Sequence, residues 1–155
     1  MRVNPKEFED RVRKGWIKSF PDGIIIRLYD TMNGYFNIKN ICDFIGYVYP
    51  NIYFLECKVH AGASIPFDKI TQYDKMIEVA GLHGVRSGVI IYLYDKEKVY
   101  YVPIKTIEKM KADGKKSVGL RAVEEGYRII EIPSTKLRVF MDSDYTILKD
   151  LEEGD

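Results

Sequence analysis

The chain has 155 residues, of which 46% are hydrophobic and 30% are charged, and its formal net charge is +1. This composition is typical of a globular protein, and we expect one domain over residues 1–155 with a frayed acidic tail at 150–155. The near-neutral charge excludes a uniformly basic nucleic-acid binder, so any basic surface must be local.

Cysteine content and the distribution of apolar residues bear on location. Two cysteines and two histidines are too few for a disulfide framework, which favours a cytoplasmic protein. The N-terminus contains no apolar core of a signal peptide, and no segment approaches the ~20 apolar residues of a membrane span. We therefore expect no membrane association.

The first predicted element is a helix over residues 6–19. Asn4 can cap it, a proline occupies its first turn, and apolar residues recur every fourth position. Glu9 lies beside the apolar stripe and is interpreted either as a solvated partner of the helix dipole or as part of a site. Arg11 and Lys14 are candidate phosphate contacts or simply solvated side chains.

A strand is predicted over residues 23–29, followed by a loop over 30–40 that is rich in Asn and Gly. Tyr35 lies at the centre of this loop. Its ring could stack on an unpaired nucleobase, or it could tuck onto the sheet.

Residues 41–59 predict a β-hairpin whose turn is Tyr49-Pro50-Asn51, because both arms are rich in β-branched and aromatic residues. Side chains alternate along a strand, so Glu56 and Lys58 share one face of the second arm. Folding about the turn brings Asp43 beside Glu56. Two carboxylates and one ammonium are thus predicted to converge on an apolar sheet.

Such a convergence requires compensation, because burying like charges together raises their pKa values or demands a counter-ion. Mg²⁺ prefers oxygen ligands and keeps waters that phosphates can replace. A neighbouring lysine can stabilise negative charge that develops during a reaction. A Glu-x-Lys triplet alone is also typical of the solvent face of an ordinary strand.

Residues 60–66, which contain Ala-Gly-Ala-Ser, predict a flexible loop after the hairpin. The rest of the chain predicts alternating helices and strands. A helix over 69–80 places Gln72 off its apolar stripe, and an apolar run over 89–94 indicates a strand buried on both faces. The remaining predicted elements are a strand over 99–102, a helix over 103–111 and a short edge strand over 127–132. Around the second helix lies a basic cluster whose members could neutralise phosphates or form a solvated helix end: Lys105, Lys109, Lys111, Lys115 and Lys116.

An acid followed by a strand with Glu-x-Lys is the pattern of the PD-(D/E)xK nuclease superfamily. The segment ECKVHAGASIPFDKITQYDKM, residues 56–76, resembles the RecU-type Holliday-junction resolvases. Ile65-Pro66-Phe67 matches their Phe-Pro-Leu-like element, Gln72 with Met76 matches their Gln-x-x-x-Met, and GKKS at 114–117 resembles their Gly-Arg-Lys-Ser. The resemblance runs from about Lys6 to Tyr127. It is closest to short phage-encoded members, in which a stretch resembles Asn-Ile-Cys-Asp-Phe-Ile at residues 40–45.

The resemblance implies a restriction-endonuclease-like α/β fold, with a mixed β-sheet core of about five strands flanked by helices. It also implies a Mg²⁺-dependent endonuclease, with Mn²⁺ as a substitute, that resolves four-way DNA junctions by paired nicks during recombination and repair. Two nicks in one junction require two active sites, so a homodimer is expected.

The resemblance also assigns roles to individual residues. Asp43, Glu56 and the main-chain carbonyl of Cys57 would hold the metal, Lys58 and Gln72 would complete the catalytic set, and Glu9 would support it. Cellular members carry Thr-Thr-Asp where this chain has Ile-Cys-Asp, so their Thr ligand has no counterpart. Their long stalk corresponds here only to residues 28–40.

Two other functions remain open at this point. One is a nuclease of the same superfamily that acts on linear or damaged DNA. The other is a non-catalytic DNA-binding protein that assists recombination.

Overall fold

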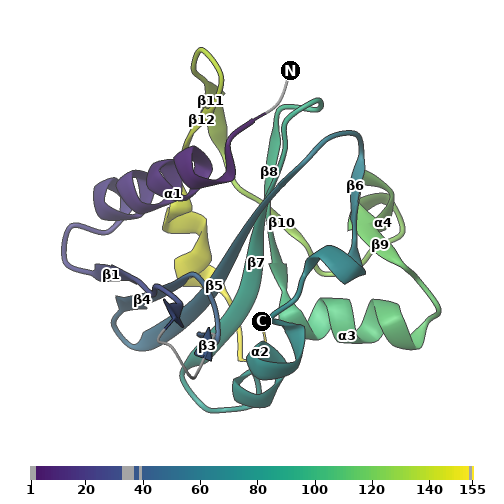
Figure 1. The fold of residues 1–155 in the computed structure, drawn as a ribbon, viewed down its shortest axis with the longest axis horizontal. Coiled ribbons are helices and arrows are strands. Elements are labelled where there is room, and N and C mark those ends of the chain that lie inside the picture. Colours follow the sequence, from purple (N-terminus) through teal and green to yellow (C-terminus); the bar gives the residue numbers. More distant parts are fainter. Residues whose placement is uncertain (1–2, 33–36, 39, 154) are drawn as a thin grey trace.

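The computed structural model describes residues 3–32, 37–38, 40–153 and 155. Its centre is a six-stranded sheet in which β5 and β7 are parallel and the other neighbours are antiparallel (Figure 1). In spatial order the strands are β1 (Ile24–Arg27), β4 (Phe44–Val48), β5 (Asn51–His60), β7 (Val85–Leu93), β8 (Lys98–Pro103) and β10 (Ile130–Glu131). The predicted mixed sheet is confirmed, with six strands instead of about five.

Helices cover both faces of the sheet. Helix α1 (Pro5–Ser19) is capped by Asn4, whose side chain accepts a hydrogen bond from the Lys6 N–H at 2.9 Å. Its apolar stripe joins a core with alternate residues of β5 and β7. Helices α2 (Tyr73–Val79) and α3 (Ile104–Ala112) join a second core with the intervening β7 residues. All nine residues of β7 are buried, as predicted for a central strand.

The β4–β5 hairpin forms as the sequence predicts. Its turn contains a cis Tyr49–Pro50 peptide bond, and its register pairs Phe44 with Leu55 and Val48 with Asn51. Because a short turn fixes which residues face one another, this register also fixes what lies opposite the residues just before β4.

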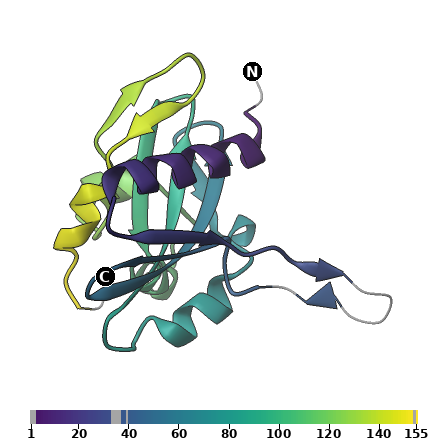
Figure 2. The same ribbon diagram turned by 90° about the vertical axis from the view of Figure 1, so that its left-hand side faces the viewer.

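Two segments expected to be loops contain strands. Within residues 30–40, β2 (Thr31–Met32) pairs with β3 (Asn37–Ile38), and this ribbon projects from the sheet (Figure 2). After β5, β6 (Ser64–Pro66) pairs with β9 (Ser117–Gly119), so the predicted flexible loop at 60–66 is wrong. A side chain at Gly119 would collide with the Ala63 carbonyl, which explains the glycine there.

Other boundaries also differ from the predicted ones. The helix expected over 69–80 is a 3₁₀ turn, η1 (Phe67–Lys69), followed by the shorter α2. Four further elements had no prediction: α4 (Leu120–Glu124), the hairpin strands β11 (Ser134–Lys136) and β12 (Met141–Ser143), and the 3₁₀ helix η2 (Tyr145–Asp150).

The C-terminal residues pack against the sheet, where the acidic composition predicted a frayed tail. Leu151 is buried, Glu153 lies 3.4 Å from Arg86, and Asp155 lies 3.0 Å from Arg128. These contacts join described residues of this segment to the rest of the chain, and the frayed tail stays a prediction. None of the helices in the described ranges combines the length and apolar character needed to cross a membrane.

Candidate functional site

Asp43 and Glu56 lie side by side where β4 begins. The Asp43 N–H donates to the Leu55 carbonyl at 3.1 Å, one residue out of the β4–β5 register, so Asp43 stays hydrogen-bonded to β5 with its carboxylate next to that of Glu56. The Asp43 carboxylate accepts a hydrogen bond from the Cys57 N–H at 2.8 Å. The proximity of the two acids, predicted from the turn, is confirmed.

Glu56 is a buried acid whose carboxylate is only partly paired with other groups. The residue is 3% exposed, and its Oε1 has no hydrogen-bond partner among the described residues. Lys58, on the same strand face as predicted, places its Nζ 3.5 Å from Oε2. Burial, and next the charge of Asp43, raise the pKa of Glu56 to about 8 against the opposing effect of Lys58.

Arg27 links this pair to Glu9. Its Nη2 lies 3.0 Å from the Glu9 carboxylate and 3.6 Å from that of Asp43. Its Nη1 donates to the main-chain oxygens of Asp43 and Leu28. Burial raises the pKa of Glu9, the Asp43 charge adds to this, and Arg27 opposes it. One guanidinium thus joins α1, β1 and the start of β4.

The sequence reasoning missed Arg27, although a signal was available. In Ile24-Ile25-Ile26-Arg27, strand alternation puts Arg27 on the same face as the half-buried Ile25. A charged residue on the inward face of a strand beside a helix that carries Glu9 predicts an ion pair.

Cys57 contributes main-chain atoms and not its thiol. Burial raises the pKa of the thiol well above its ordinary range, with Asp43 adding to the effect, so the sulfur stays protonated. The Cys57 N–H points to Asp43, and in an antiparallel ladder the carbonyl of the same residue lies on that same edge. The carbonyl is therefore available beside the two acids.

Gln72 does not contact the acids. It is half-buried and occupies the position just before α2. Within the part of the chain that the structure describes, no hydrogen bond joins its amide to Asp43, Glu56 or Lys58.

The predicted basic contacts are spread over two regions. On α1, Arg11 is exposed and Lys14 pairs with Asp10 at 2.8 Å. In α3 the Lys109 ammonium lies 3.6 Å from Asp113, and after α3 the Lys115 ammonium lies 2.7 Å from Glu125 while Lys116 is exposed. Tyr35 lies outside the described residues.

The donor set at Asp43 and Glu56 fits a hard divalent cation. Two carboxylates and a carbonyl are oxygen donors, which suit Mg²⁺ with water at its other positions. The unpartnered Glu56 oxygen and the raised Glu56 pKa are both relieved by a nearby cation. Across the described ranges, no group of three or more His, Cys, Asp and Glu side chains is arranged as a metal site. Water and the carbonyl would therefore have to complete the coordination.

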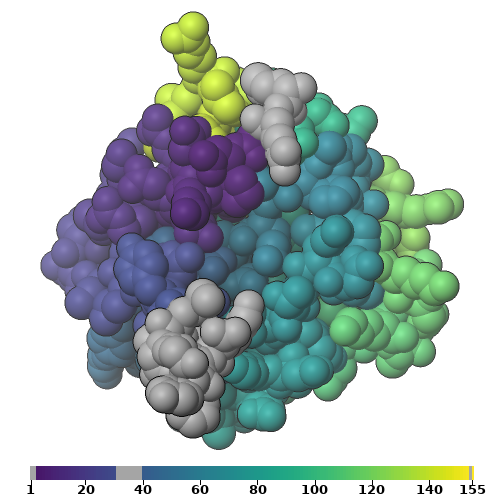
Figure 3. Space-filling model, viewed as in Figure 1, coloured from purple at the N-terminus to yellow at the C-terminus, as the bar shows by residue number. Residues whose placement is uncertain are grey.

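The cluster is accessible from solvent. Asp43 and Lys58 keep 19% and 28% of their side-chain surface exposed. In the space-filling view, the blue surface of the β4–β5 hairpin is visible between purple α1 and the teal segments that follow β5 (Figure 3). A phosphate could therefore approach the acids from this side.

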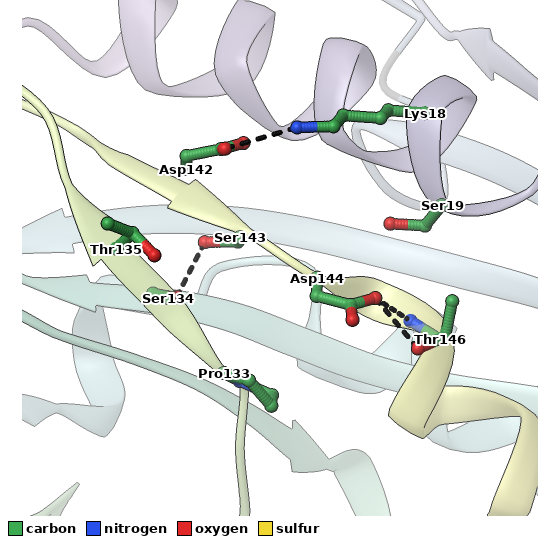
Figure 4. Close-up of a pocket in the computed structure, with 9 residues that line it drawn as sticks. All are labelled: Lys18, Ser19, Pro133, Ser134, Thr135, Asp142, Ser143, Asp144 and Thr146. Atoms are coloured by element: carbon green, nitrogen blue, oxygen red, sulfur yellow. Dashed lines mark hydrogen bonds and ion pairs between the residues drawn. The ribbon is translucent and has the colours of Figure 1, made fainter.

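A groove of about 590 Å³ lies at the C-terminal end of α1, and none of the predicted site residues lines it (Figure 4). Its polar groups satisfy one another: Lys18 lies 3.2 Å from Asp142, the hydroxyls of Ser134 and Ser143 lie 2.8 Å apart, and Asp144 accepts from Thr146.

Comparisons with known proteins bear on the fold and the family of this chain. Among solved structures, Hjc from Archaeoglobus fulgidus, described as a Holliday junction resolvase from an archaeal hyperthermophile, has a TM-score of 0.56 at 14% identity, covering 79% of this chain and 94% of its own. This likeness shows a restriction-endonuclease-like fold. A search of curated proteins gave no significant match. The model of the family RecU, recombination protein U, matches residues 21–142, and the chain therefore belongs to the RecU family.

Proposed function

We propose that this protein is a Mg²⁺-dependent endonuclease that resolves four-way DNA junctions by paired symmetric nicks. The observation that carries the proposal is the buried Glu56 beside Asp43, with the Lys58 ammonium 3.5 Å away, in a chain of the RecU family. The likeness to Hjc, described as a Holliday junction resolvase, supports the choice of branched DNA as substrate.

The residues of the cluster divide the chemical work. Asp43, Glu56 and the Cys57 carbonyl would hold Mg²⁺, and Mn²⁺ should substitute because it accepts the same oxygen donors. When bound, the ion would polarise the scissile phosphate and lower the pKa of an attacking water. Lys58 would stabilise negative charge on the phosphate, because Glu56 fixes its ammonium beside the acids.

Three further residues would support this arrangement. Glu9 and Arg27 hold Asp43 from the helix side, since the guanidinium contacts both carboxylates. Gln72 is proposed to steady the bound phosphate from the start of α2, on the segment that follows β6.

DNA binding would use basic residues on either side of the cluster. Arg11 and Lys14 on α1, with Lys109 in α3 and Lys115 and Lys116 after it, would neutralise backbone phosphates in a salt-dependent manner. The β2–β3 ribbon, which contains Tyr35 between its strands, corresponds to the shortened stalk. Paired nicks require two active sites in one complex, so we propose a two-fold homodimer.

A cleavage assay tests the proposal. A four-way junction, a linear duplex of the same sequence and its single strands are incubated with and without Mg²⁺. We expect Mg²⁺-dependent nicks at symmetric positions in the junction. Equal cleavage of the linear duplex would instead indicate a general nuclease, and tight binding without metal-stimulated cleavage would indicate an accessory protein.

A further inference from the structure

Tyr29 is an exposed aromatic residue beside the acidic cluster that no motif predicts. It lies where the chain leaves β1 for the β2–β3 ribbon, and it is 75% exposed. The Arg27 guanidinium lies over its ring, 5.0 Å from the centroid, and also 5.5 Å from the ring of the buried Phe44. A chain of contacts between flat groups therefore runs from the core to an exposed tyrosine ring.

The backbone that carries this ring is held in place. The Asn40 side chain donates to the Tyr29 carbonyl at 2.6 Å, and the Asn40 N–H donates to Asp30 at 2.8 Å. Arg27 is itself fixed by Glu9 and by the Asp43 main chain. A ring held by these contacts loses little conformational entropy when a ligand stacks on it.

A pocket of about 350 Å³ lies against Tyr29 and has both cationic and carboxylate side chains in its lining. Lys6 and Arg13 in its lining can approach a phosphate, and Glu9 and Asp10 can accept hydrogen bonds from the amino groups of a base. The pocket shares Arg27 with the acidic cluster, and that guanidinium lies 3.6 Å from the Asp43 carboxylate.

We propose that Tyr29 is a stacking platform for a nucleobase that is unpaired at the branch point, next to the reacting phosphate. The inference rests on the proposed function and names the feature of the substrate that this surface recognises. Bases of an intact duplex are stacked on one another, so only an unpaired base can offer a free face. The platform would therefore favour branched over linear DNA.

The test uses the full chain in EDTA, so that no cleavage occurs. Binding of Tyr29→Leu and Tyr29→Phe to a four-way junction, a linear duplex and a single strand is measured by fluorescence anisotropy. Tyr29→Leu should weaken binding to the junction and the single strand about 10-fold, the size of one base–aromatic stack, and binding to the duplex by less than about 2-fold. Tyr29→Phe should bind like the wild type.

The control variant is Tyr49→Leu, which removes an exposed tyrosine at the far end of the β4–β5 hairpin. It should leave all three affinities unchanged. Thermal melting of each variant establishes that it is folded. An equal loss on all three DNAs, unchanged junction binding by Tyr29→Leu, or the same loss in Tyr49→Leu would overturn the platform.

The two proposals fail in different ways. If the wild type cleaves junctions while Tyr29→Leu binds them normally, the platform is wrong and the proposed function stands. If the wild type never cleaves but Tyr29→Leu loses single-strand binding, the proposed function is wrong and the platform stands.

Discussion

The two polar regions at opposite ends of α1 differ in how their charges are satisfied. In the groove of Figure 4, Lys18 neutralises Asp142 and the hydroxyl groups pair with one another. In the acidic cluster, three carboxylates face two cations, and one oxygen of Glu56 has no partner among the described residues. Both acids of the groove, Asp142 and Asp144, are exposed to solvent, whereas the acidic cluster buries Glu56 with one oxygen unpartnered among the described residues. We take a buried charge without full compensation, and not the volume of a cavity, as the sign of a functional site.

The largest expected effect follows from removing one acid of the cluster. Asp43→Asn or Glu56→Gln should lower Mg²⁺-dependent junction nicking at least ~100-fold, because each removes a proposed metal ligand. Asp142→Asn in the groove should stay within twofold. Initial nicking rates measure the difference. Wild-type rates in both cluster variants would exclude these residues from the chemistry.

The second-largest difference between the acidic cluster and the groove should be in how stability depends on pH. Glu56 has an ordinary pKa of 4.5 and a folded-state pKa of about 8, so between these values the folded chain binds a proton that the unfolded chain has lost. Stability from this group is therefore complete below about pH 4.5 and disappears as pH rises through about 8.

Thermal melting in EDTA across this range measures the effect. Glu56→Gln should flatten the decline, and Asp142→Asn should leave it unchanged. Mg²⁺ should raise the melting temperature more at pH 8 than at pH 5, because it binds the ionised carboxylates. A decline of wild-type steepness in Glu56→Gln would contradict this assignment.

A smaller effect, on the free energy of unfolding, is expected from removing the positive charge of Arg27. Arg27→Gln leaves the half-buried Glu9 and Asp43 uncompensated and should cost about 1–3 kcal/mol of unfolding free energy in EDTA. Added Mg²⁺ should restore part of that loss. Urea denaturation with and without the ion provides the measurement, and a loss that Mg²⁺ leaves untouched would mean that Arg27 is only a packing residue.

The smallest effect belongs to the groove. Lys18 is 74% exposed at its side chain, so Lys18→Gln should change the unfolding free energy by less than ~1 kcal/mol, with no response to Mg²⁺. A change as large as that of Arg27→Gln would remove the contrast between the two ends of α1.

Much of the acidic pair was predictable because its geometry is local. The turn at Pro50 fixes the β4–β5 register, and the residue before β4 stays hydrogen-bonded to β5, which brings Asp43 close to Glu56. Helix α1 was equally predictable, from its Asn4 cap and from the apolar residues at every fourth position. In both cases the interactions that decide the structure join residues close in the sequence.

The features that sequence reasoning missed depend on distant contacts. Strand β6 pairs with β9, which lies more than fifty residues later in the sequence, and neither strand has a strong pattern of its own. Arg27 acquires its role only because β1 lies between α1 and the segment before β4. Local propensity does not encode the β6–β9 pairing, and for Arg27 it indicates only the inward face of β1.

The pairing of β6 with β9 joins the segment that follows the strand of Lys58 to the basic segment after α3. The Phe67 N–H also donates to the Lys116 carbonyl at 2.9 Å, so these two parts of the surface cannot shift independently. For a DNA strand held at both, the protein and not the DNA sets the spacing between the anchored phosphate and the acids. The fold would then act as a ruler for the position of the cut.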